Sequence, residues 1–87
     1  MRLEFPEGAK IGDILSVTWS PLGDGIVETG THDGRLSGIK ASRLTVHFVY
    51  GFYDPPEETI VINLETGMDE KYHVPIIDVQ LKHSTQA

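Results

Sequence analysis

Short runs of alternating apolar and polar residues, divided by glycine- and proline-containing turns, are the feature that most constrains the fold of this chain. No segment carries apolar residues at positions i, i+3, i+4 and i+7 over several helical turns, so a helical bundle is excluded. The composition agrees, because Val, Ile and Thr together occur 22 times and Ala only three times, and β-branched side chains favour strands. We therefore expect an all-β fold.

Five short strands are expected between the turn signals. The strongest spans residues 42–53, whose two faces are both largely apolar, so we expect a central strand that bends at Gly51 and stops before Pro55. Pro75 is expected at an edge or a bulge. The other strands are expected at residues 11–19, 26–31, 59–64 and 71–81, and the turns at residues 20–25, 32–35, 54–57 and 65–67. Residues 36–41 fit either an extended hairpin or an irregular loop.

The apolar faces of the strands define the expected core. Because side chains alternate between the two faces of a strand, Leu15, Val17 and Trp19 share one face of the first strand. The same alternation gives the strongest strand a larger apolar face, made by Leu44, Val46, Phe48, Tyr50 and Phe52.

The length of 87 residues allows one domain. We expect it to span residues 1–87, with flexible termini at residues 1–8 and 83–87. The absence of cysteine excludes a disulfide-stapled fold and any cysteine nucleophile or metal ligand. The sequence holds no signal-peptide core and no run of about 18 apolar residues that could span a membrane. We expect the cytoplasm of a cell or of an infected host, with a virion as the alternative.

Residues 12–17 and 20–28 combine a Gly-Asp step, a Pro/Gly loop and a Gly-Ile-Val step. This combination resembles the opening hairpin of SH3-like barrels, including Tudor-like and KOW-type domains. Residues 46–51 resemble the strand before the Tyr-Gly turn of Tudor domains. The resemblance covers residues 11–64, but residues 30–42 are longer and less regular than the family pattern, and residues 65–87 have no counterpart.

The resemblance implies a small five-stranded SH3-like barrel that catalyses nothing and binds proteins, modified peptides or nucleic acids. Closure into a barrel is also favoured on physical grounds, because it removes sheet edges that a short chain cannot otherwise protect. An OB-like barrel and a compact sandwich stay open as alternatives, because both share this strand count.

Aromatic and acidic residues gather around the end of the strongest strand. Three rings and a carboxylate can bind a cation by cation–π attraction, and aromatic side chains on a turn suit protein contacts. The competing interpretation is that the rings with core parity simply fill the interior, whereas Tyr53 has the opposite parity and is expected to be exposed. The candidate binding residues are Trp19, Tyr50, Phe52, Tyr53, Asp54, Pro55, Pro56 and Glu57.

Enzymatic chemistry is not expected. No serine stands in a nucleophile-elbow context, and no glycine-rich segment has the lysine-serine step of a phosphate loop. The histidines lack the close spacing of a metal motif, although His47 and His73 would meet if their strands pair. We therefore expect no catalytic residues, no metal and no cofactor. The four histidines are His32, His47, His73 and His83.

The net charge of −6 is unevenly distributed. Residues 1–43 carry five basic and six acidic residues (5 − 6 = −1), whereas residues 44–87 carry two and seven (2 − 7 = −5). This polarised acidity argues against nucleic acid and favours a protein partner with a basic or cationic surface. We expect a protein-interaction module, able to form homo-oligomers. The alternatives are a structural subunit of a viral or phage particle (decoration, neck or tail protein) and an acidic inhibitor or decoy of a nucleic-acid-binding protein.

Overall fold

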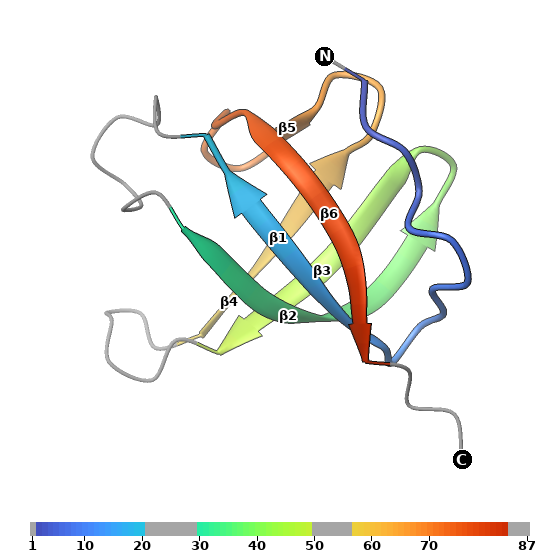
Figure 1. The fold of residues 1–87 in the computed structure, drawn as a ribbon. Coiled ribbons are helices and arrows are strands. Elements are labelled where there is room, and N and C mark those ends of the chain that lie inside the picture. Colours follow the sequence, from blue (N-terminus) through green and yellow to red (C-terminus); the bar gives the residue numbers. More distant parts are fainter. Residues whose placement is uncertain (1, 21–29, 50–56, 84–87) are drawn as a thin grey trace.

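Six antiparallel strands form one sheet in the computed structural model, which describes residues 2–20, 30–49 and 57–83 (Figure 1). None of these residues lies in a helix, as the sequence predicted. The strands are β1 (Ile14–Trp19), β2 (Thr31–Lys40), β3 (Arg43–Val49), β4 (Glu57–Asn63), β5 (Met68–Asp69) and β6 (Ile76–His83).

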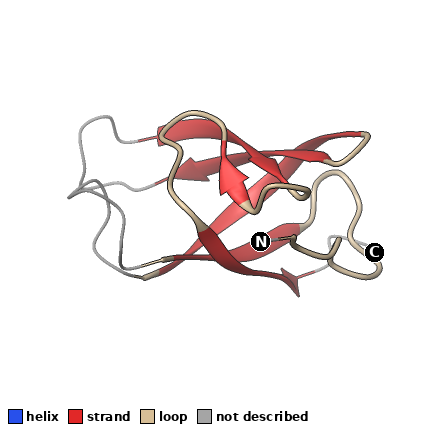
Figure 2. Cartoon of the chain, turned by 90° about the horizontal axis from the view of Figure 1, so that it is seen from above, coloured by secondary structure: helices blue, strands red, loops and turns tan. Residues whose placement is uncertain are grey.

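The strand order is β5-β4-β3-β2-β1-β6, so the chain meanders through five strands and the sixth returns beside the first. The sheet is strongly curled into an open half-barrel, and Figure 2 shows its strands facing one another across the interior. Its two edges meet at one end, where Met68 forms a bridge with Pro75 and Ile76 N donates to Gly67 O at 2.7 Å. The prediction of an all-β fold is confirmed, whereas the described residues form six strands in place of five, and the sheet is an open half-barrel where a closed barrel was predicted.

The turn predicted at residues 32–35 was wrong, because these residues lie inside β2. The prediction relied on Asp33-Gly34 as a hairpin signal, but the glycine serves packing instead. A Cβ atom on Gly34 would lie 2.6 Å from Cγ1 of Val46 and 2.8 Å from Cδ1 of Phe48. Gly34 therefore lets β2 approach the side chains of β3 closely. The strand expected at residues 26–31 lies mostly outside the described residues.

Residues 36–40 complete β2, which answers the question that the sequence left open. The register between β2 and β3 shifts between Leu36 and Gly38, and this bulge breaks the alternation on which sequence reading depends. A tight turn then joins Lys40 to Arg43, with Ala41 at a φ of 53°.

The strongest predicted strand is confirmed as β3 over its described part, and its expected bend at Gly51 lies outside that part. The strand expected at residues 59–64 is β4, and the turn at residues 65–67 is confirmed. The strand expected from residue 71 was placed too early, because β6 begins at Ile76. Pro75 lies in the isolated bridge at the sheet edge, as predicted. The two residues of β5 are too few for alternation to show.

The core fills the concave inner face of the sheet. Leu15, Val17 and Trp19 from β1 are buried there, which confirms the predicted apolar face, and so is the described half of the β3 face (Leu44, Val46 and Phe48). The amino-terminal segment adds three buried residues that the sequence did not single out, Leu3, Pro6 and Ala9, and Leu3 N donates to Leu64 O at 2.7 Å. That the termini are flexible in solution stays a prediction.

Candidate interaction site at one end of the sheet

Polar and aromatic side chains gather on the inner face where β1 ends and β4 begins. We call this region the Trp19 end and define it by Trp19, Glu58, Asp69 and Tyr72. β1 supplies Trp19 as its last residue, β4 supplies Glu58, and β5 supplies Asp69, with Tyr72 in the turn that follows. Trp19 and Asp69, which are 50 positions apart in the sequence, are in contact because the sheet curls.

Asp69 is fully buried and fully hydrogen-bonded. Its Oδ2 accepts from Trp19 Nε1 at 3.1 Å, and its Oδ1 accepts from the backbone N–H groups of Tyr72 at 2.5 Å and His73 at 3.2 Å. His73 follows this turn with a φ of 60°. A buried carboxylate is stable only with such partners. Asp69 therefore fastens the turn after β5 to the end of β1.

Glu58 is the second buried carboxylate of the Trp19 end, with a side chain that is 6% exposed. It accepts hydrogen bonds from the Tyr72 hydroxyl and from Lys71 Nζ, the latter at 3.1 Å. The bond to Glu58, followed by burial, raises the pKa of Tyr72 to about 12. Tyr72 therefore stays protonated, and remains a hydrogen-bond donor, throughout the physiological pH range.

The Trp19 ring lies between two other rings. Its centroid is 5.2 Å from that of Phe48 on β3 and 5.7 Å from that of His32 on β2, the latter in an edge-on arrangement. Such pairs add to the stability that burial provides. Trp19 is 3% exposed, so its ring packs inside the curled sheet and stabilises this end.

Beside the half-exposed Lys71, the exposed negative charge among the described residues of the Trp19 end comes from Glu57, the first residue of β4. Its side chain is 62% exposed, and its Oε1 lies 3.9 Å from Nε2 of His47 on the neighbouring strand. His47 in turn places Nδ1 3.0 Å from the Thr59 hydroxyl. The buried carboxylates fix the shape of this end, and Glu57 presents a negative charge to the surroundings.

A separate polar cluster lies on the outer face. Glu70 accepts from Arg43 Nε at 2.7 Å and from Asn63 Nδ2 at 3.0 Å. The hydrogen bond from Arg43, helped by that from Asn63, holds the pKa of Glu70 below its usual value. Residues 57–70 hold five carboxylates and no Lys or Arg, yet Glu58, Asp69 and Glu70 are engaged within the chain. Within residues 57–70, the predicted acidic surface is therefore reduced to Glu57 and Glu65, and its remaining residue, Asp54, lies outside the described residues.

Of the eight candidate binding residues, the structure describes two. Trp19 is buried at the end of β1, and Glu57 is exposed at the start of β4. The other six, Tyr50, Phe52, Tyr53, Asp54, Pro55 and Pro56, lie outside the described residues, so their role stays a prediction. They adjoin the Trp19 end in sequence, since β3 ends at Val49 and β4 begins at Glu57.

Sequence reasoning missed the inward position of Glu58. Alternation could have found it, because Glu58, Ile60 and Ile62 share one parity and are all buried. The roles of Lys71 and Tyr72 had no comparable signal, because they depend on the path of the turn after β5.

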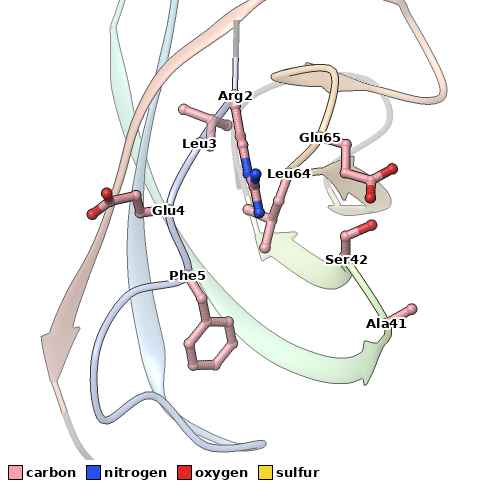
Figure 3. A pocket seen from close by; sticks show the side chains of 8 residues that line it. All are labelled: Arg2, Leu3, Glu4, Phe5, Ala41, Ser42, Leu64 and Glu65. Atoms are coloured by element: carbon pink, nitrogen blue, oxygen red, sulfur yellow. The ribbon is translucent and has the colours of Figure 1, made fainter.

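An open groove lies at the opposite end of the sheet, which we call the Ala41 end. Its volume is about 620 Å³, and it separates the amino-terminal segment from the β2–β3 turn and the end of β4. Figure 3 shows the Arg2 side chain running beside Leu64, while the carboxylate of Glu4 points away from them. The lining residues are Arg2, Leu3, Glu4, Phe5, Ala41, Ser42, Leu64 and Glu65.

No protein-family model, curated protein or solved structure matches this chain. Within the described ranges, no three His, Asp or Glu residues gather in a way that could hold a metal ion. The same residues include no helix that is long and apolar enough to cross a membrane.

Proposed function

We propose that this protein is a non-catalytic protein-binding module with an SH3-like barrel fold, and that its Trp19 end contacts a basic or cationic surface of the partner. The strand order supports the fold assignment. Five strands follow one another in a meander and the last strand returns to β1, whereas an OB fold is a Greek-key barrel.

The observation that carries the proposal is the completeness of the buried polar network at the Trp19 end. Glu58 and Asp69 receive their hydrogen bonds from the chain itself. This end is therefore shaped before a partner arrives, and a preformed surface loses little entropy on binding. Glu57 adds an exposed negative charge there.

The residues that we propose to complete the contact precede Glu57 in the chain. They are Tyr50, Phe52, Tyr53, Asp54, Pro55 and Pro56. Aromatic residues lose few rotamers on binding and commonly dominate interfaces. Replacing both Phe52 and Tyr53 with alanine should abolish the capture of partner proteins from native material.

A direct test uses a lysine-rich decapeptide as the probe and NMR as the readout. The chain has one tryptophan, so the indole N–H signal of Trp19 reports on this end without ambiguity. We expect saturable chemical-shift changes of this signal and of the Glu57 and Glu58 amides. Added salt should lower the affinity of the decapeptide, because exposed charges are screened.

The matched variants are Glu57→Lys and Glu65→Lys, which make the same charge change at opposite ends of the sheet. Glu57→Lys should weaken binding of the decapeptide about tenfold, as expected for an interface charge reversal, and Glu65→Lys should change it far less. Equal effects of the two variants, or the absence of saturable shifts, would overturn the proposal.

A further inference from the structure

β6 leaves one of its two sides open. Trp19 N donates to Gly30 O, and Asp13 O accepts from Leu36 N, so the odd-numbered residues at both ends of β1 direct their backbone groups toward β2. Because these directions alternate along a strand, Ser16 and Thr18 face β6. Their partners there are Gln80 and Asp78.

Val79 and Leu81 therefore direct their backbone N–H and C=O groups away from β1, toward the open edge. The sheet order places no strand beyond β6. The backbone contacts between this edge and the segment around β5 involve Pro75 and Ile76 and go no further along β6. Pro75 forms the bridge with Met68, and Ile76 N–H donates to Gly67 O. Among the described residues, no backbone hydrogen bond beyond those to β1 covers the edge from residue 77 to residue 83. An uncovered edge of this kind is a template for another strand.

We propose that a second copy of this chain occupies this edge, with the two β6 strands antiparallel about a twofold axis at Gln80. In this register Val79 of each chain lies opposite Leu81 of the other, so outward-facing backbone groups meet outward-facing groups. Each Asp78 then lies opposite the partner's Lys82. The proposal does not rest on the proposed function, because residues 78–82 lie outside the Trp19 end.

The opposite charges of Asp78 and Lys82 favour a second copy of this chain at the edge and favour this register of the two β6 strands. Asp78, Gln80 and Lys82 share the outer face by alternation, since Val79 between them is buried. Moving the register by one hydrogen-bonded pair in either direction sets Gln80 opposite Asp78 or Lys82 and loses both ion pairs. Opposite charges directly across antiparallel strands stabilise the pairing, and twofold symmetry supplies the contact twice.

The proposed contact uses one carboxylate without an ion-pair partner in the described part of the chain and one lysine that already pairs within its own chain. Asp78 has no ion pair among the described residues, and Lys82 has a side chain that is 47% exposed. Lys82 Nζ lies 2.5 Å from Asp33 Oδ2 on β2 of the same chain. In the dimer Lys82 would lie between Asp33 of its own chain and the partner's Asp78.

The test is a charge-exchange cycle measured by sedimentation velocity over a concentration series. It is performed in an Asp33→Asn background, so that the ion pair within the chain is absent from every variant. We expect the parent to associate weakly, as small interfaces do, and D78K or K82D alone to weaken association about tenfold or more. The double variant D78K/K82D should return to within about threefold of the parent, because it restores both ion pairs.

Hydrogen exchange of the natural sequence provides the second measurement. The amides of Val79 and Leu81 should become protected as the protein concentration rises. A monomer at every concentration, a double variant that does not recover, or an edge that pairs only with added extended peptides would overturn the proposal. Circular dichroism of each variant verifies that the sheet is intact.

Discussion

The two ends of the half-barrel are closed in different ways. At the Trp19 end, side chains far apart in sequence form a buried network around Asp69 and Glu58. At the Ala41 end, the amino-terminal segment is hydrogen-bonded to the chain after β4, and an open groove lies between this segment and the tight β2–β3 turn. A buried polar network stabilises only when it is complete, so substitutions should cost more at the Trp19 end than at the Ala41 end.

The largest effect is expected for Asp69→Ala. The change leaves Trp19 Nε1 and the backbone N–H of Tyr72 without their acceptor, whereas His73 N–H keeps its second acceptor, the backbone carbonyl of residue 69. Loss of charge-assisted bonds in a buried site should lower the free energy of unfolding by about 3 kcal/mol. Urea unfolding followed by Trp19 fluorescence measures this, and Asp69→Asn, which keeps one acceptor oxygen, should lose less. A loss below about 1 kcal/mol for the alanine variant would contradict the role given to Asp69.

Gly34→Ala should destabilise the protein by about 1–3 kcal/mol, the usual cost of overpacking a core. Its Cβ would lie 2.6 Å from Val46 Cγ1, beside the Phe48 ring that supports Trp19. Gly38→Ala is the matched control toward the Ala41 end, because there the nearest atom, Thr45 Cβ, is 3.3 Å away. Thermal unfolding of both variants should rank Gly34→Ala as clearly the worse, and equal losses would argue against close packing at Gly34.

Tyr72→Phe should cost about 1 kcal/mol at neutral pH, because Glu58 then keeps one of its two donors. The pKa of Tyr72 is about 12 in the folded protein against a reference of 10.0. A raised folded pKa means that the contribution is complete below the unfolded value and is lost as the pH rises through the folded one. Chemical unfolding at pH 8 and at pH 12 should show the difference between the two proteins shrinking. If the difference in unfolding free energy were the same at both pH values, it would not come from the hydrogen bond between Tyr72 and Glu58.

The smallest effect, and an increase in stability, is expected for Ala41→Gly. Ala41 has a φ of 53°, a conformation that costs alanine more than glycine. Part of this gain is offset by the greater freedom of glycine in the unfolded chain, so the variant should gain about 0.5 kcal/mol. Ser42→Gly at the next position, where φ is not positive, should bring no gain. A loss of stability in Ala41→Gly, measured by urea unfolding, would show that the turn is not strained.

Alternation along the strands was enough to predict the all-β class and the part of the core that lies on β1 and β3. β1 and β3 follow it without interruption, and the described residues of their predicted apolar faces are buried. β2 does not, because Gly34 imitates a turn signal and the bulge after Leu36 changes the parity. The prediction of a turn at residues 32–35 therefore failed because Gly34, which is typical of a turn, is needed here for close packing between β2 and β3.

The Trp19 end was predictable only in part. The sequence placed Trp19 on the core face, but the partners of its indole and of Glu58 come from the turn after β5. That turn is positioned by a two-residue strand and by the meeting of the sheet edges at Pro75. Contacts of this kind depend on the curl of the whole sheet, which no local pattern encodes.

The contrast between the two ends is tested most directly by native-state hydrogen exchange of two protons. The indole N–H of Trp19 is bonded to Asp69 at the Trp19 end, and Leu3 N–H is bonded to Leu64 O at the Ala41 end. We predict that the indole proton exchanges only through global unfolding, whereas the Leu3 amide exchanges through local opening at a lower free energy. An indole proton that exchanges as easily as the Leu3 amide would contradict a Trp19 end fixed by its buried network.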